Sequence, residues 1–195
     1  MIANPFIQVS QSFIVVPMNN AQAITEVRAI LNRRYQNYNQ LPNPERVLLA
    51  AAVLADDIQV REVGGNNKGE WVEAILEGVK LGEGYPWCAA FIEFCCDVAG
   101  FTAGPTDRAS AAVDSWLTWA RMEGRVTSNP KRGDLCLWKR STGNHIGIVT
   151  DLTITSVMSI EGNTTPGATG NQRDGGGCYR RTRLRNSWTH FISLG

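Results

Sequence analysis

One cysteine in this chain stands where its thiol could act as a nucleophile. Cys88 directly follows Pro86 and Trp87 and opens an almost wholly apolar run, 88–98, that is typical of a buried helix. The first turn of a helix carries N–H groups without partners and a partial positive charge, and both favour a thiolate over a thiol. The sequence therefore predicts a reactive cysteine at a helix N-terminus, beside a site that can hold an oxyanion.

A base and an orienting group follow Cys88 in chain order. His145, one of only two histidines, begins an apolar run that predicts a buried strand. Glu161 and Asn163 stand at the end of the next such run, and either side chain could accept a hydrogen bond from the imidazole Nδ1. We expect Glu161 to be the closer partner. A cysteine, a histidine and an orienting carboxylate or amide form the set that cysteine hydrolases use.

Four further residues near these motifs are candidates for binding a substrate. Tyr85 lies in a glycine-flanked loop that favours a groove, whereas Trp87 could line a groove or fill the core, and we favour the core. Asn67 belongs to the turn 64–69, which turn chemistry alone would explain, and Asn144 directly precedes His145. The spacing of cysteines and carboxylates matches neither a zinc nor a calcium site, so we expect no metal and no cofactor.

The pattern of apolar residues predicts helices first and strands afterwards. Helices are expected at 21–38, 45–58, 70–80, 88–98 and 109–123, with Asn43 capping the second and Pro44 at its first position. Strands are expected at 134–139, 145–152, 155–161, 179–185 and 190–194. This order is an α+β plan. Residues 1–20 are expected to form an extended arm, and the two helices after it are either an accessory bundle or a layer on the main fold.

Charge and hydropathy exclude several classes of partner. The chain has 19 Lys and Arg against 18 Asp and Glu, so no overall field attracts nucleic acid or an anionic membrane. The arginines of 180–185 are interpreted as the solvated outer face of a strand. No run approaches the roughly 20 apolar residues of a spanning helix, and we see no signal peptide. We therefore expect synthesis in the cytoplasm and no membrane span.

The remaining cysteines indicate a reducing compartment rather than a disulfide framework. Five is an odd number, and the adjacent Cys95 and Cys96 are poor partners for each other on a helix. We interpret Cys95, Cys96 and Cys136 as small core residues. Cys178 follows a glycine run and could be exposed. A glycine-rich surface loop is expected at 163–177, beside the site.

Four motifs in the same order resemble those of the CHAP-type amidohydrolases and peptidases, a group within the papain-like NlpC/P60 superfamily. They occupy 86–91, 132–135, 143–149 and 161–163, and the resemblance spans about residues 60–195. It implies a papain-like α+β fold in which a nucleophile helix packs on an antiparallel sheet. It also implies that Cys88 is the nucleophile, that His145 is its base, and that Glu161 orients the imidazole with Asn163 assisting. Residues 1–60 would form an N-terminal helical extension, and 61–195 the catalytic domain.

The activity that this resemblance implies is cleavage of an amide bond in peptidoglycan through a thioester. The bond would be either the one between muramic acid and L-alanine or one within the stem peptide or cross-bridge. Such an enzyme acts on the cell wall, either released by a phage, carried in a virion or delivered as a toxin. Two alternatives stay open. The same triad could serve a transacylase, and a non-catalytic assembly component could use the fold, with the N-terminal arm contacting a protein partner.

Overall fold

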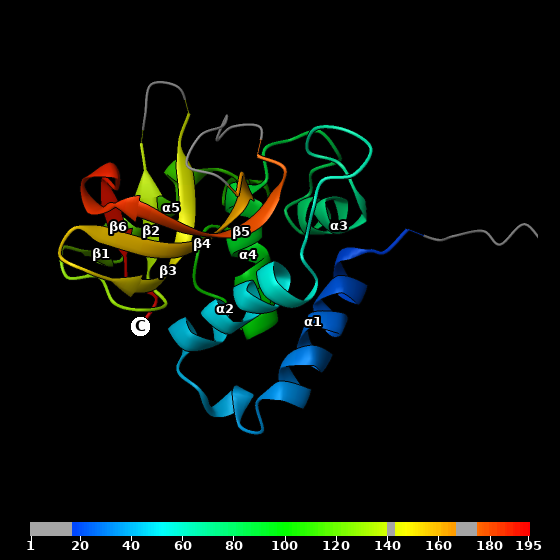
Figure 1. Ribbon diagram of the computed structural model, residues 1–195, viewed down its shortest axis with the longest axis horizontal. Helices are drawn as coiled ribbons and strands as arrows, with labels where there is room; N and C mark the ends of the chain where they lie inside the picture. Colours follow the sequence, from blue (N-terminus) through cyan, green and yellow to red (C-terminus); the bar gives the residue numbers. More distant parts are fainter. Residues whose placement is uncertain (1–16, 140–142, 167–174) are drawn as a thin grey trace, which may run out of the picture.

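The computed structural model describes residues 17–139, 143–166 and 175–195 and has the α+β plan that the sequence predicts (Figure 1). Short 3₁₀ turns cover Tyr38–Gln40, Asp107–Ala111 and Arg185–Ser187, and one π-helical turn covers Val53–Asp57. The α-helices are α1 (Asn20–Arg34), α2 (Asn43–Ala52), α3 (Glu70–Gly78), α4 (Cys88–Ala99) and α5 (Val113–Met122). Nearly all of the N-terminal arm and most of the glycine-rich stretch fall outside the described residues.

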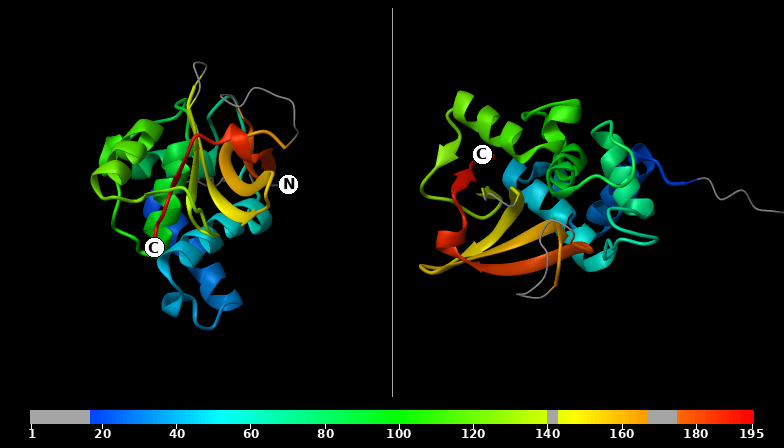
Figure 2. Two further views of the ribbon diagram at one scale, coloured as in Figure 1. Left: turned by 90° about the vertical axis from the view of Figure 1, so that its left-hand side faces the viewer. Right: turned by 90° about the horizontal axis from the view of Figure 1, so that it is seen from above.

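The strands form one antiparallel sheet in the order β1-β6-β2-β3-β4-β5. The pair β1 and β6 stands at one edge, and the long β4–β5 hairpin forms the other edge (Figures 1 and 2). The strand β1 has no counterpart among the predicted strands, because two residues carry no periodicity. The strands are β1 (Val126–Thr127), β2 (Leu135–Trp138), β3 (His145–Leu152), β4 (Ser156–Thr164), β5 (Gly177–Leu184) and β6 (His190–Ile192).

The helix α4 lies at the centre of the molecule. Ten of its residues are buried, and it contacts α1, α2 and α3 as well as β3 and β4 (Figures 1 and 2). Val27 of α1 and Leu48 of α2 belong to the same apolar core as the residues of α4. Of the two arrangements considered for the N-terminal helices, the structure therefore shows a layer on the main fold. A domain boundary between residues 60 and 61 stays a prediction.

A second, smaller apolar core covers the other face of the sheet. It consists of five buried residues: Cys136, Val149, Val157, Trp188 and Phe191. Along β3, Ile146 and Ile148 belong to the α4 core, whereas Val149 belongs to the second core. Because side chains alternate along a strand, His145 and Gly147 share the face of Val149. The second core therefore shields the charged side chains on this face from water.

Several local predictions were wrong. The helix α2 begins at Asn43, so this residue does not cap it, and the preceding Pro42 makes no side-chain cap. The regular part of α2 ends at Ala52, where a π-helical turn takes over, and α5 starts only after a 3₁₀ turn. Cys178 is fully buried because it lies in β5, which starts two residues earlier than predicted. Within the described residues, no helix is long and apolar enough to cross a bilayer.

Candidate active site

Cys88 is the first residue of α4, as the sequence predicts. The first backbone hydrogen bond of the helix runs from Phe91 N to Trp87 O at 2.8 Å, and Trp87 supplies no side-chain cap. The backbone N–H groups and the partial positive charge at this end of the helix are therefore available to an anion. The helix is buried along its length, and Cys88 itself is 7% exposed, which places the thiol where the helix end approaches the surface.

Trp87 fixes the start of this helix. Its side chain is fully buried, its ring packs edge-on against Phe91, and its Nε1 donates to Glu62 Oε1 at 3.0 Å. The second oxygen of Glu62 accepts from the backbone N–H of Asn67 at 2.9 Å. Trp87 is therefore a core residue in this structure, and its candidate role in substrate binding stays a prediction.

His145 lies at the start of β3, opposite Trp138 of β2, and is 3% exposed. Its Nε2 lies 2.9 Å from Glu161 Oε2, and Cys88 lies near enough to the ring to act on its pKa. Burial by itself would lower the pKa of His145, but the hydrogen bonds and charges of Cys88 and Glu161 outweigh burial and raise it to about 9. The imidazole is therefore protonated at neutral pH.

The ring nitrogen that meets Glu161 differs from the prediction. The expected orienting bond is at Nδ1, whereas the structure has it at Nε2. The carboxylate comes from the neighbouring strand β4, and Nε2 is the ring nitrogen that reaches it. This leaves Nδ1 as the nitrogen available to the thiol of Cys88.

Glu161 is fully buried and accepts hydrogen bonds at both oxygens. Oε1 accepts from Ser159 Oγ at 2.7 Å and from Arg183 Nε at 2.8 Å. Oε2 faces His145 and accepts from Arg183 Nη2 at 2.6 Å and from Thr164 Oγ1 at 3.3 Å. Burial acts to raise the pKa of this carboxyl, but the bonds from Arg183 and His145 hold it well below its usual range. Glu161 is therefore a carboxylate at any working pH.

Two glycines make room for this arrangement. A Cβ at Gly147 would lie 2.8 Å from Glu161 Cγ and 3.1 Å from the carbonyl oxygen of Ile160. A Cβ at Gly162 would lie 2.6 Å from Phe91 Cβ. The first glycine therefore lets the carboxylate pass across β3, and the second lets β4 pack closely on α4.

Asn163 lies beside this network without completing it. It is buried, adopts a φ of +52°, which asparagine tolerates better than most residues, and occurs where β4 shifts register between Glu161 and Thr164. Within the described part of the chain, its Oδ1 has no hydrogen-bond partner. Asn163 therefore does not accept the imidazole N–H, and the structure places Glu161 in that position.

The other three candidates for substrate binding differ in their exposure. Tyr85 is 49% exposed, in the loop that leads into α4. Asn67 is buried, and its Nδ2 and carbonyl oxygen both bond Gly84, so it ties two loops together. Asn144 is partly buried and donates from Nδ2 to Asp114 Oδ1 of α5 at 3.0 Å. Tyr85 is thus the candidate that a ligand could reach most freely.

Arg183 does not stand out in the sequence as a site residue. The predicted solvated face is wrong for Arg183, whose side chain is only 9% exposed, and for Arg181, which is also buried. Val157 of β4 lies opposite Arg183 in the sheet, so the arginine and Glu161 share the face that carries the second core. Arg180, one residue out of phase with it, is exposed and pairs with Asp56. Because arginines occur in both phases of this strand, alternation could not reveal which ones face inward.

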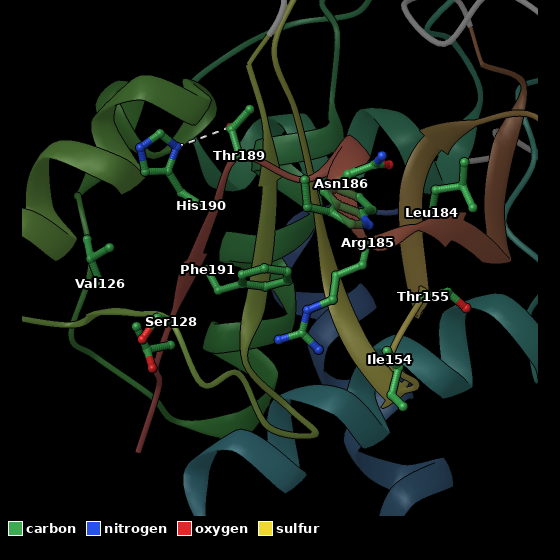
Figure 3. A pocket seen from close by; sticks show the side chains of 12 residues that line it. Val126, Ser128, Ile154, Thr155, Leu184, Arg185, Asn186, Thr189, His190 and Phe191 are labelled. Carbon is green, nitrogen blue, oxygen red and sulfur yellow. Dashed lines mark hydrogen bonds between the residues drawn. The ribbon is translucent and has the colours of Figure 1, made fainter.

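A surface pocket of about 660 Å³ lies apart from this site (Figure 3). Its wall comes from β1, β6, the turn between β3 and β4, and the end of β5, and it includes Ile154, Leu184 and His190. Cys88, His145 and Glu161 are not among the residues that line it. The contacts among these three residues therefore define the candidate site, and this pocket does not.

The family model of the CHAP domain matches residues 80–163, somewhat under half of the chain. All four motifs of the resemblance lie within this match, which confirms it. The CHAP family is in general cysteine-dependent and hydrolytic, and its substrate is peptidoglycan, so the match supports an enzyme of this kind. No curated protein and no solved structure matches the chain. Arg183 lies beyond the matched segment.

Proposed function

We propose that this protein is a cysteine hydrolase that cleaves an amide bond of peptidoglycan through a thioester. The observation that carries the proposal is the buried pair of His145 and Glu161 with Cys88 close to the imidazole at the N-terminus of α4. Cys88 lies at the end of the central helix, and His145 lies on the sheet against which that helix packs, which is the arrangement expected of a papain-like fold.

The geometry gives each group a role in the reaction. His145 holds the proton of the thiol, and the thiolate of Cys88 attacks the carbonyl carbon of the amide. The backbone N–H of Cys88, at the start of α4, donates to the oxyanion, and Tyr85 is our candidate for a second donor. Loss of one such donor typically costs about 3 kcal/mol of barrier. The imidazolium then protonates the leaving amine, and water hydrolyses the thioester.

The charge on Glu161 supports this cycle. Its carboxylate accepts from Nε2, which fixes the orientation of the ring and leaves Nδ1 for the thiol. A carboxylate also stabilises the imidazolium more strongly than an amide oxygen would. A non-catalytic component would have no need of this continuous set of contacts. The N-terminal arm as a contact for a protein partner, and release by a phage, a virion or a toxin system as the route to the wall, remain parts of the proposal.

The test is digestion of purified peptidoglycan by the parent protein, Cys88→Ala and His145→Asn. Turbidity loss and fragment masses are the measurements, and only the parent should cut. His190→Asn is the matched control, because it removes the other histidine and should cut like the parent. A new amino terminus on L-alanine would identify an amidase, and one further along the stem or cross-bridge would identify an endopeptidase. If the parent cuts none of several peptidoglycan types, the proposal is wrong.

A further inference from the structure

We propose that Arg183 is a positioning residue, which acts on Cys88 and His145 through Glu161 and sets the pH range in which the thiol is nucleophilic. The inference rests on the proposed function, because it concerns the same site. Arg183 reaches the imidazole through Glu161. Its guanidinium donates to both oxygens of Glu161, and Oε2 is the oxygen that is hydrogen-bonded to the imidazole.

The contact is a fork, with Nε on one carboxylate oxygen at 2.8 Å and Nη2 on the other at 2.6 Å. Such a bidentate pair fixes the plane of the carboxylate as well as its charge. Nη2 also lies 3.3 Å from Thr164 Oγ1, which itself bonds Glu161. Rotation of Glu161 away from His145 would break both arms of the fork. The guanidinium therefore fixes the position of Oε2 relative to the imidazole of His145.

Two indole rings hold the guanidinium in this position. The Cζ atom of Arg183 lies 5.1 Å from the ring centroid of Trp138 and 5.9 Å from that of Trp188. The two rings pack edge-to-face at a centroid distance of 6.1 Å. A cation next to aromatic faces is stabilised most when it is desolvated, as here. Trp138 also lies opposite His145 in the sheet, so this ring and the imidazole belong to adjoining strands.

The balance of charge explains why a cation is needed at this place. A working site holds a thiolate and an imidazolium, and the carboxylate of Glu161 adds a second negative charge. Arg183 supplies a second positive charge in direct contact with that carboxylate. Without Arg183 the carboxylate loses the cation that bonds both of its oxygens, and this loss of positive charge favours uptake of a proton by the site. Release of Glu161 from Nε2 would lower the pKa of the imidazole, and the thiolate would lose the imidazolium that stabilises it.

Other ionisable groups also face Glu161. Arg181 on β5 is buried and its charge acts on Glu161, and its guanidinium donates to the backbone carbonyl of Thr165. Cys136 on β2 and Cys178 on β5 are buried, and burial raises the pKa of both thiols, so they stay neutral. From α4, the ionisable group at the site is Cys88 itself. The position of the pH profile therefore depends on the fork of Arg183.

The experiment measures the rate at which iodoacetamide alkylates Cys88 as a function of pH, with the site identified by mass spectrometry. The other four cysteines are at most 1% exposed, so a native protein should react at Cys88 first. In Arg183→Met, the acid limb of the profile should move to higher pH by roughly 1–3 units. Arg183→Lys keeps the charge and loses the fork, so its acid limb should lie between that of the parent and that of Arg183→Met. Arg180→Met removes an exposed arginine from the same strand and should keep the parental profile.

A double-mutant cycle separates action through Glu161 from a general effect of charge. In the Glu161→Gln background, adding Arg183→Met should leave the acid limb nearly where Glu161→Gln alone puts it. An unmoved limb in Arg183→Met, or an equal shift with and without Glu161, would overturn the inference. If Arg183→Met does not fold, the comparison of Arg183→Lys with the parent decides, since a parental profile there refutes the role of the fork. Alkylation needs no peptidoglycan, so its outcome is independent of whether the proposed activity is found.

Discussion

Replacing Glu161 by glutamine keeps the shape of the side chain and removes the charge that faces His145. The pKa of His145 is about 9, against an ordinary value of 6.5. That difference corresponds to about 3 kcal/mol in favour of the imidazolium. Cys88 and Glu161 each contribute a hydrogen bond and a charge, so loss of the Glu161 charge should remove a substantial part of this energy. The pKa of His145 should fall by roughly 1–2 units.

Nitrogen NMR of the imidazole rings measures this directly, because the chain has only two histidines. The signal of His190 is assigned by its absence from His190→Asn, and the other signal reports His145. Glu45→Gln is the control, since it removes a carboxylate that pairs with Arg132 at the surface. A His145 titration that stays within about 0.3 units of the parent in Glu161→Gln would refute the electrostatic account.

Two further substitutions test the packing that positions the site. Gly147→Ala places a Cβ 2.8 Å from Glu161 Cγ and should reduce turnover at least about tenfold, while Gly82→Ala, which meets open space, should not; parental turnover in Gly147→Ala would contradict the close approach. Trp87→Phe leaves the partly buried carboxylate of Glu62 without its indole donor and should lower the free energy of unfolding by about 1–3 kcal/mol in a urea titration. An unchanged midpoint would show that this bond does not anchor the start of α4.

The sequence predicts the elements that carry the reacting groups well, and the reason is physical. The helix α4 and the strand β3 are long, apolar and bounded by turn residues, so their periodicity is unambiguous. Cys88 and His145 lie at their first residues, where a polar side chain in an apolar run stands out. The predicted order of helices and strands follows from the same patterns.

The connections between these elements could not be predicted in the same way. Which ring nitrogen meets Glu161 depends on the direction from which β4 approaches, and periodicity does not encode that direction. The burial of Arg183 depends on the pairing of β4 with β5 and on two tryptophans from other segments. Asn43 was assigned a cap from its residue type alone, although the helix already includes it. The first two of these features are tertiary contacts between distant residues, and the third is a local helix boundary.

The double covering of the sheet connects the fold to the chemistry. The side of β3 that holds Ile146 and Ile148 packs on α4, and the other side is covered by the second core. A histidine and a glutamate on that second side are hidden from water, and their charges must be balanced locally because burial of an unpaired charge is costly. Arg183 provides that balance from the neighbouring strand. The same shielding strengthens each charged contact. On a face open to solvent the charged contact between His145 and Glu161 would be weaker, so we regard the second core as part of the machinery that makes Cys88 reactive.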